Sequence, residues 1–174
     1  MMPASVIAQD TLNELIETAR VCPPGDFVEV GVYKGGSAAR LAEVAKEQHR
    51  RLFLFDTFCG IPHADPTVDH HKVGDFNDTS LREVQAALPD AICIPGVFPG
   101  TLPAELISIA LAHIDCDQYR SVFDCCFMLA PRMVSGGVMV FDDYDCIPGA
   151  AKAVTECFND RVVMSARGKA RVYF

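Results

Sequence analysis

Apolar residues recur along this chain in two patterns, at helical spacing and in short continuous runs. Near the N-terminus, helical spacing predicts a helix over residues 5–21, which Cys22-Pro23-Pro24-Gly25 then ends. Further helical patterns predict helices at 37–48, 80–88, 121–129 and 150–158. The continuous apolar runs predict strands at 26–31, 52–55, 91–94, 111–114 and 138–141.

The alternation of these strands and helices determines the expected fold class. Continuous apolar strands separated by helices are typical of a mainly parallel sheet that is covered on both faces. The last two runs, 161–164 and 170–174, flank an Ala166-Arg167-Gly168 turn and predict an antiparallel hairpin. We therefore expect one α/β domain over residues 1–174, in which the N-terminal helix precedes a doubly wound, seven-stranded core at 26–174.

One connection is too long for an ordinary turn. Residues 59–78 are polar and rich in Pro, His and Asp. Loops of this length in compact domains are usually functional or mobile, so this segment is a candidate for a role at a binding site.

Composition narrows the class of partner. The chain has 174 residues, of which 50% are hydrophobic and 22% charged, enough to bury a continuous core. Its net charge is −8 and its Lys and Arg residues do not cluster, which argues against nucleic acid or an anionic membrane surface as a partner. A small molecule is the expected partner.

The eight cysteines and the N-terminus indicate a reducing compartment. No signal-peptide pattern and no apolar run of roughly 18 residues occurs, so we expect a cytoplasmic protein that does not enter the membrane. In that compartment the cysteines are expected to be reduced, mostly core thiols. Zinc is the alternative, but no Cys-x2-Cys pair occurs, and adjacent Cys125 and Cys126 point to different faces of a helix.

Four carboxylates follow two strongly apolar runs, at Asp115, Asp117, Asp142 and Asp143. Because like charges repel when they are removed from water, such a group must hold protons at raised pKa or recruit a cation. Oxygen ligands of this kind select a hard divalent ion such as magnesium, manganese or calcium. In an extended continuation of the strand, Asp115 and Asp117 would share one face.

A glycine-rich segment, Glu29 to Ser37, lies between a predicted strand and a helix. Glycines there let the backbone turn and approach a ligand, and the helix N-terminus attracts an anion. The dinucleotide pattern fails because Tyr33 takes the second glycine position, and no Lys-Ser or Lys-Thr completes a phosphate loop. Asp56 follows at close to the roughly 20-residue spacing of an acid that binds ribose hydroxyls. The alternative is a plain turn and a solvated acid.

Together these segments resemble a known family. The motifs that carry the resemblance are Glu29–Ser37, Asp56–Pro62, Gly74–Phe76, Gly96–Pro103, His113–Tyr119 and Asp142–Tyr144. In this order they are similar to the macrocin O-methyltransferase family, whose members use S-adenosylmethionine and a metal to methylate sugar hydroxyls. The resemblance covers residues 26 to about 160 and implies a Rossmann-like methyltransferase sheet.

The resemblance also implies a role for each motif residue. The glycine loop, with Glu29, Gly31, Tyr33 and Gly35, would hold the methionine part of S-adenosylmethionine. Ser37 would meet the carboxylate of that methionine. The remaining implied roles are ribose binding by Asp56, ligation of a divalent metal, expected to be Mg2+, by Asp115, Asp142 and Asp143, contact of Asp115 with the cofactor, and general-base catalysis by Asp117.

A metal ion and a nearby carboxylate are both useful for methylating a hydroxyl. A hydroxyl is a poor nucleophile at neutral pH; a divalent ion lowers its pKa and a nearby carboxylate can take its proton. His113 could act as a second base, but a histidine in such a strand is more often a packed residue, and we favour that interpretation. Tyr144 and Asp145 could line the acceptor site, although packing and a loop charge explain them equally well.

The sequence departs from the family in two places. Few residues precede the strand at 26–31, where relatives carry a longer segment that helps form a lid, and Arg120 and Ser121 follow Tyr119 where an acid is commoner. A second subunit, in a homodimer, or the 59–78 loop could therefore close the site. Two other functions stay open: a cofactor-binding protein without turnover, and a metal-dependent hydrolase or phosphotransferase, which would leave the glycine loop and Asp56 unused.

Overall fold

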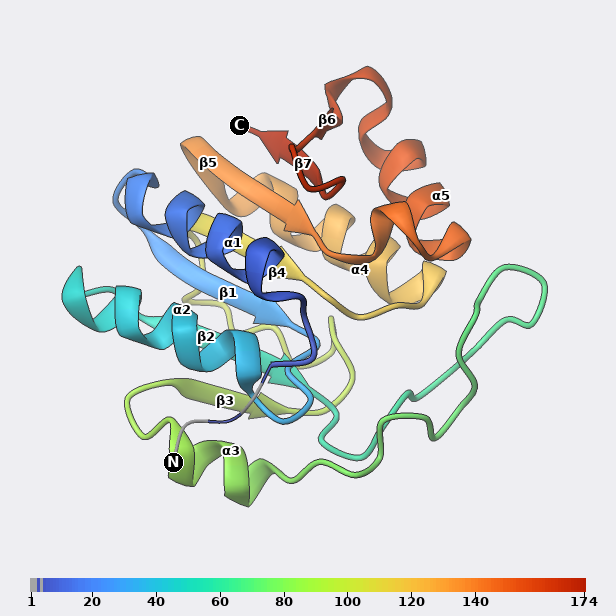
Figure 1. The fold of residues 1–174 in the computed structure, drawn as a ribbon, viewed down its shortest axis with the longest axis horizontal. Helices are drawn as coiled ribbons and strands as arrows, with labels where there is room; N and C mark the ends of the chain where they lie inside the picture. Colours follow the sequence, from blue (N-terminus) through green and yellow to red (C-terminus); the bar gives the residue numbers. More distant parts are fainter. Residues whose placement is uncertain (1–2, 4) are drawn as a thin grey trace.

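The computed structural model describes residue 3 and residues 5–174, and it shows a seven-stranded sheet between two layers of helices (Figure 1). The strands are β1 (Asp26–Val30), β2 (Leu52–Asp56), β3 (Ile92–Pro95), β4 (Ile109–Ile114), β5 (Met133–Phe141), β6 (Val163–Met164) and β7 (Ala170–Tyr173). The helices are α1 (Gln9–Val21), α2 (Gly36–Glu47), α3 (Leu81–Ala87), α4 (Tyr119–Leu129) and α5 (Pro148–Phe158).

The strand order is β3-β2-β1-β4-β5-β7-β6. Strands β1 to β5 pair in parallel, whereas β7 is antiparallel to both β5 and β6. The order reverses direction between β1 and β4, as in other doubly wound sheets, and ligands of such sheets bind beside this point. The predicted α/β fold with a C-terminal antiparallel pair is confirmed.

Alternating strand residues bury the two faces of the sheet. Phe27, Leu54 and Leu111 face the layer of α1, α2 and α3, whereas Phe53 and Phe55 face α4 and α5. Strands β1, β2 and β4 bury both of their faces, which explains why they read as continuous apolar runs rather than alternating ones.

Several predicted boundaries were wrong. Strand β5 begins at Met133, before the predicted 138, because its first half, which includes Gly136, is largely exposed and carries no apolar run. Strand β6 is only Val163–Met164, since Asn159–Arg161 forms a short 3-10 turn. Helix α1 begins at Gln9 rather than at residue 5, and helix α4 begins at Tyr119 rather than at Ser121.

The cysteines are all free of disulfides, and most of them belong to the core or pack against it. Cys125 and Cys126 are buried, and four others are partly buried against the two hydrophobic clusters, namely Cys22, Cys93, Cys116 and Cys157. Cys59 and Cys146 are exposed, because they lie on loops. No helix within residues 5–174 has the length and apolar character needed to cross a membrane.

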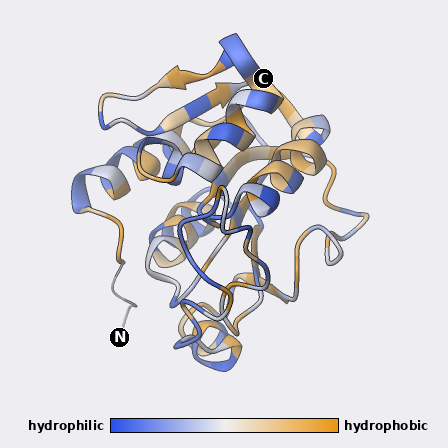
Figure 2. Cartoon of the chain, turned by 90° about the vertical axis from the view of Figure 1, so that its right-hand side faces the viewer, coloured by the Kyte–Doolittle hydropathy of each residue, from blue (hydrophilic) through white to orange (hydrophobic). Residues whose placement is uncertain are grey.

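The 59–78 loop extends along the carboxyl end of the sheet without forming a helix or strand (Figure 1). Figure 2, seen from the side on which this loop lies, shows hydrophilic residues along much of it. Its path brings it against the start of α4, which matters for the site described next.

Candidate active site

The carboxyl ends of four parallel strands meet at one edge of the sheet. Val30 pairs with Phe55 and with Ile114, and Ile114 pairs with Phe141. The residues that follow these positions in β1, β2, β4 and β5 therefore lie side by side. They are Gly31, Asp56, Asp115 and Asp142, all of which the sequence had singled out.

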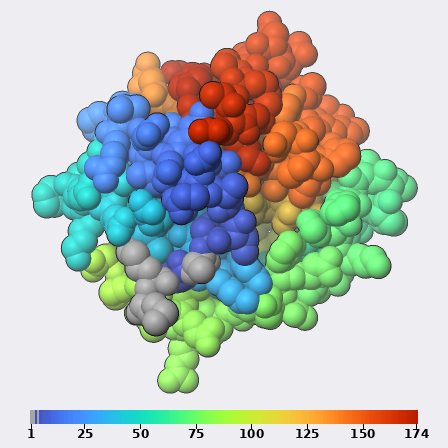
Figure 3. All heavy atoms as spheres, in the orientation of Figure 1, coloured from blue at the N-terminus to red at the C-terminus, as the bar shows by residue number. Residues whose placement is uncertain are grey.

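A cavity of about 260 Å³ opens at this edge. Gly31, Tyr33 and Asp56 lie on one side of it, and the acidic residues that follow β4 and β5 lie on the other. Apolar side chains complete the wall, among them Ile7 from the N-terminal segment and Phe76 from the 59–78 loop. In the space-filling view, the blue N-terminal residues, the green loop and the orange C-terminal part surround this hollow (Figure 3).

Gly31 allows the turn after β1 to approach the end of β4. Its φ is +89°, and a Cβ built there would lie 1.7 Å from the carbonyl oxygen of Asp115. Neither the left-handed backbone nor the space admits another side chain. The first glycine of the loop is thus required by the close contact between two elements of the cavity.

Asp56 fastens the glycine loop to β2. Its Oδ2 accepts hydrogen bonds from the backbone N–H groups of Val32 at 2.7 Å and Tyr33 at 2.8 Å, and its Oδ1 accepts one from Phe58 N–H at 2.7 Å. A carboxylate has about four lone-pair sites, so Asp56 keeps acceptor capacity for a ligand hydroxyl in the cavity. The predicted contact with ribose is compatible with this geometry and stays a prediction.

Glu29, Ser37 and His113 form a buried network behind the cavity. Ser37 Oγ donates to Glu29 Oε1 at 2.5 Å, and His113 Nδ1 lies 2.9 Å from the same oxygen. Burial disfavours the imidazolium, but the hydrogen bond to Glu29 and the nearby carboxylate charges raise the pKa of His113 overall. This supports His113 as a packed residue rather than a second base.

The network changes what is expected of the predicted cofactor residues. Glu29, Gly35 and Ser37 are not among the residues that line the cavity, whereas Gly31, Tyr33 and Asp56 are. The Ser37 hydroxyl is engaged with Glu29, so a direct contact of Ser37 with the cofactor stays a prediction that this arrangement does not favour. Glu29 and Ser37 join the end of β1 to the start of α2, and contact of Glu29 with the cofactor also stays a prediction, because its Oε2 is buried without a hydrogen-bond partner among the described residues.

Asp115, Asp142 and Asp143 each offer one carboxylate oxygen, and these oxygens all lie within 4.8 Å of one another. Burial, followed by the charges of the neighbouring aspartates, raises the pKa of Asp115 well above its usual value. Burial and the Asp117 charge raise the pKa of Asp143 to about 7. The three carboxylates repel one another, and their all-oxygen donor set fits a hard divalent cation.

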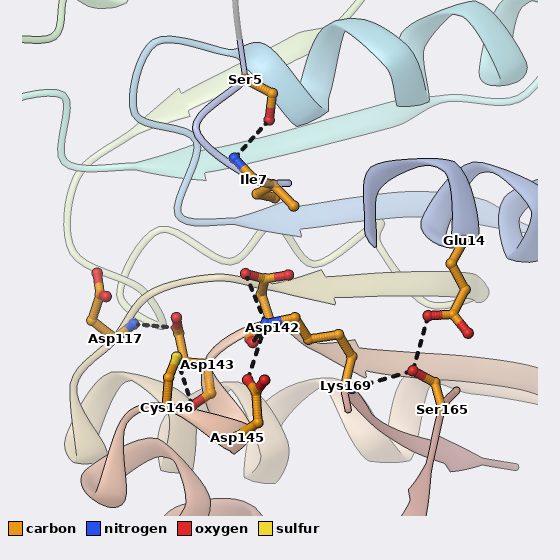
Figure 4. A network of polar contacts seen from close by, with 10 residues as sticks. All are labelled: Ser5, Ile7, Glu14, Asp117, Asp142, Asp143, Asp145, Cys146, Ser165 and Lys169. Carbon is orange, nitrogen blue, oxygen red and sulfur yellow. Dashed lines mark hydrogen bonds and ion pairs between the residues drawn. The ribbon is translucent and has the colours of Figure 1, made fainter. Parts of the chain in front are cut away.

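Asp117 lies beside this cluster, but not in the extended arrangement that the sequence suggested. Strand β4 ends at Ile114, and Asp117 has a φ of +61° in the left-handed region. The expectation that Asp115 and Asp117 share a strand face was therefore wrong, although both line the cavity. The backbone N–H of Asp117 donates to Asp143 Oδ2 at 3.0 Å, and its carboxylate points away from Asp143 (Figure 4).

Burial, together with the charges of Asp142 and Asp75, raises the pKa of Asp117 to about 6. At neutral pH the carboxylate is then largely ionised yet more basic than an ordinary aspartate. These are properties that a general base requires.

Sequence reasoning missed Lys169. Its Nζ donates to the carbonyl oxygen of Asp142 at 2.6 Å and to Asp145 Oδ1 at 3.0 Å, and it lies 3.6 Å from Asp142 Oδ2 (Figure 4). The predicted C-terminal hairpin could have indicated this lysine. Ala170 pairs with Phe141 in antiparallel fashion, so the residue before Ala170 lies near Asp142, the residue after Phe141. Lys169 does not line the cavity, and it partly offsets the negative charge of the aspartate cluster from outside it.

Tyr144 and Asp145 do not line the cavity among the described residues. The Tyr144 hydroxyl lies 3.3 Å from Thr155 Oγ1, and Asp145 pairs with Lys169. Both contacts favour the packing interpretation over the acceptor-site one.

Comparison with known proteins identifies the family. The family model described as Macrocin-O-methyltransferase (TylF) matches residues 7–167. The chain belongs to this family. The resemblance inferred from the motifs is thereby confirmed.

Similar proteins of named function come from actinobacteria. A mycinamicin III 3''-O-methyltransferase of Micromonospora griseorubida is 32% identical over 90% of this chain and 70% of its own length. A rhamnosyl-tetracenomycin-C 4'-O-methyltransferase of Streptomyces olivaceus is 33% identical over 78% of this chain. A demethyldecarbamoylnovobiocin O-methyltransferase of Streptomyces niveus is 30% identical over 76% of it. The chain spans only 59% and 58% of these last two relatives.

Solved structures with the same fold extend the comparison. The O-methyltransferase NovP superimposes with a TM-score of 0.77 at 24% identity, covering 94% of this chain and 78% of NovP. A calicheamicin methyltransferase superimposes with a TM-score of 0.81 at 21% identity, covering 94% of this chain and 77% of the other. These likenesses establish the Rossmann-like methyltransferase fold.

Proposed function

We propose that this protein is an S-adenosylmethionine-dependent O-methyltransferase that methylates a hydroxyl of a small, sugar-bearing natural product with the help of a divalent metal. The observation that carries the proposal is the single cavity that joins the glycine loop and Asp56 to a cluster of aspartates. A cofactor on one side and an acceptor hydroxyl on the other would then be in contact.

The cofactor side of the cavity suits a nucleoside with a charged tail. Asp56 offers acceptor oxygens for ribose hydroxyls, and Val97 and Phe98 form an apolar wall close to the end of β2, where a purine ring would pack. Gly31 lets the backbone approach the sulfonium part. S-adenosylmethionine supplies a methyl group that an oxygen nucleophile attacks in line, so the main task of these residues is to position it.

The acidic side suits the acceptor. Asp115, Asp142 and Asp143 would hold a divalent ion, and Mg2+ is the ion we expect. When bound, it would lower the pKa of the acceptor hydroxyl and orient its oxygen. Asp117, which is free of the cluster apart from its backbone N–H, would accept the hydroxyl proton on its carboxylate.

The cavity is too small to hold the whole acceptor together with the cofactor. Its volume of about 260 Å³ lies just below the roughly 300 Å³ at which small-molecule sites usually begin. The cofactor and one sugar hydroxyl would fill it. The remainder of the acceptor would lie outside, against the 59–78 loop, consistent with a relative whose name specifies a rhamnosyl-bearing acceptor.

Methyl transfer from radiolabelled S-adenosylmethionine tests the proposal. The acceptor panel would be mycinamicin III, demethyldecarbamoylnovobiocin and the rhamnosyl-tetracenomycin named by the relatives. We expect transfer to at least one acceptor, loss of transfer with EDTA, and recovery on adding MgCl2. Calorimetry should show binding of S-adenosylhomocysteine.

Two variants sharpen the test. Asp117→Asn should bind S-adenosylhomocysteine normally and lose roughly 10²-fold or more in kcat, as expected for removal of a general base. Asp160→Asn, an exposed acid remote from the cavity, is the matched control and should retain activity. Absence of S-adenosylhomocysteine binding would contradict the proposal, and transfer that is unaffected by EDTA would remove the metal from it.

Two further expectations from the sequence stay predictions, the cytoplasmic location and the homodimer. Cell fractionation would test the first and analytical ultracentrifugation the second. Neither affects the chemistry proposed for the cavity.

A further inference from the structure

The 59–78 loop is fastened to the segment that carries Asp117. Gln118, which is fully buried, donates through Nε2 to the carbonyl oxygens of His63 and His71, at 3.2 Å in each case. On the same side, Asp69 Oδ1 accepts a hydrogen bond from Tyr119 N–H at 2.7 Å. The residue after Asp117 thus holds the loop in place.

This attachment brings the His71 ring between two carboxylates. Nε2 of His71 lies 3.4 Å from Asp117 Oδ1, and Nδ1 lies 3.8 Å from Asp75 Oδ2. The Asp75 carboxylate is itself fixed, because its Oδ2 accepts a 2.8 Å hydrogen bond from Lys72 N–H. The three side chains form a row, Asp75, His71, Asp117, which ends at the cavity.

Packing fixes the plane of the His71 ring. The rings of Phe76 and His70 pack against it at steep angles, with centroid distances of 5.0 and 4.9 Å, and the His71 side chain is 25% exposed. His71 does not line the cavity, whereas Asp117 and Phe76 do. Any effect of His71 on the reaction would therefore act through Asp117.

Asp117 needs such a partner. Its backbone lies in the left-handed region, which is sparsely populated by residues other than glycine and persists when surrounding contacts hold it. Asp142 and Asp75 repel its carboxylate. Within residues 5–174, His71 is the only Lys, Arg or His side chain within ion-pair distance of that carboxylate.

We propose that His71 is a positioning residue that holds the carboxylate of Asp117 toward the acceptor hydroxyl. The inference rests on the proposed function, because it assigns His71 a task in the same reaction. It extends that function by making the 59–78 loop part of the catalytic apparatus rather than only a cover over the acceptor.

Substitutions at residue 71 separate positioning from packing. His71→Phe keeps a ring against Phe76 but removes the nitrogen that faces Asp117, and we expect kcat to fall by about 10- to 100-fold, the usual effect of losing an orienting partner. His71→Gln restores an N–H near the position of Nε2 and should recover most of that loss. His49→Asn, at an exposed histidine after α2 and away from the cavity, is the control and should retain wild-type kcat.

Comparing the change in kcat with the change in KM distinguishes a positioning role of His71 from a role in binding. KM for the acceptor and the affinity for S-adenosylhomocysteine should change less than threefold in His71→Phe, because His71 does not line the cavity. A wild-type kcat in His71→Phe would overturn the inference and leave the proposed function standing. Equal losses in His71→Phe and His71→Gln would also overturn it, since packing alone would then explain both.

A second measurement needs no acceptor and so does not depend on turnover. In long-range 1H–15N spectra of the protein with S-adenosylhomocysteine and MgCl2, Asp117→Asn should shift the ring resonances of His71. Those of His49, which lies after α2 away from the cavity, should not move. An unshifted His71 would overturn the inference even if the wild-type enzyme transferred no methyl group, an outcome that would separately refute the proposed function.

Discussion

Single residues decide how closely the elements around the cavity approach one another. Gly31 has no side chain because the end of β4 occupies the space, and Asp56 ties two consecutive amides of the same loop to β2. Lys169 offsets the charge of Asp142 and Asp145 from the far side. Each of these contacts joins two segments distant in sequence, so the cavity depends on tertiary contacts rather than on any one motif.

Gly31→Ala should therefore be far more harmful than alanine at an otherwise similar glycine. The added Cβ would overlap the Asp115 carbonyl oxygen at 1.7 Å, so backbone must move, and we expect a loss of several kcal/mol in unfolding free energy together with loss of S-adenosylhomocysteine binding. Gly74→Ala is the control, because φ is +88° there and no atom lies within 4 Å of the added Cβ. It should cost only about 1–2 kcal/mol of backbone strain.

Urea unfolding and calorimetry on both variants would measure these effects. Equal destabilisation by the two substitutions would mean that backbone strain, and not the contact with β4, is what requires glycine at residue 31.

Among the residues of the candidate site, those that directly follow buried strands could be predicted from the sequence, and few others could. Asp56, Asp115 and Asp142 could be placed together because the carboxyl ends of parallel strands meet at one edge. Lys169 and His71 could not, because one precedes a short hairpin strand and the other lies in a loop whose path no periodic pattern records. Ser37 was assigned from the resemblance alone, and its hydroxyl bonds Glu29.

At the scale of elements, the buried parallel strands could be predicted from the sequence, whereas the exposed strand segments could not. Strands β1, β2 and β4 are buried on both faces, so their apolar runs mark them almost to the residue. The first half of β5 and the whole of β6 are more exposed and leave little apolar signal. The 59–78 loop was recognised as unusual, but its attachment to the start of α4 depends on a few side chains, chiefly those of Gln118 and Asp69, which no periodic pattern records.

Gln118→Ala should release this loop. The substitution removes the donor to both the His63 and His71 carbonyl oxygens, so backbone amides over residues 61–73 should exchange hydrogen faster, by about tenfold or more for each 1.4 kcal/mol of lost local stability. Exchange in the central strands β1 and β4 should not change. Hydrogen exchange followed by mass spectrometry would resolve the two regions.

Gln85→Ala, on the exposed surface of α3, is the matched control for that experiment. Unchanged exchange over 61–73 in Gln118→Ala would show that two other contacts hold the loop by themselves, the hydrogen bond from Tyr119 N–H to Asp69 and the 3.3 Å contact of His63 Nε2 with Ser121 Oγ.

At the scale of the whole molecule, the fold concentrates negative charge where the two helical layers meet the end of the sheet. The chain carries a net charge of −8, and five of its aspartates line one cavity, four of them in the segments that follow β4 and β5. Lys169 is the ammonium group that lies against them, and it contacts only the outer side of Asp142. The sheet therefore holds these carboxylates against their mutual repulsion, and the stability of the fold should depend on whether they are protonated.

The sign of this dependence follows from the raised pKa values. Burial and the neighbouring charges raise the pKa of Asp143 to about 7 and that of Asp117 to about 6, above the value of roughly 3.9 in an unfolded chain. The folded state then binds more protons than the unfolded state, so stabilisation is fully present below about pH 4 and is lost as pH rises through 6 and 7. Without metal, the unfolding free energy should fall by about 2–4 kcal/mol between pH 5 and pH 8.

Urea unfolding in EDTA across this range would measure the decline, and two comparisons would assign it. Asp143→Asn removes one of the repelling charges, so its unfolding free energy should fall less steeply with pH, whereas Asp160→Asn should follow the wild type because that acid is exposed and remote from the cavity. Saturating MgCl2 should restore most of the loss at pH 8, since a cation that binds only the folded state stabilises it by mass action. A metal-free unfolding free energy that rises between pH 5 and pH 8 would mean that the carboxylates find compensation in the fold itself and have no need of a cation.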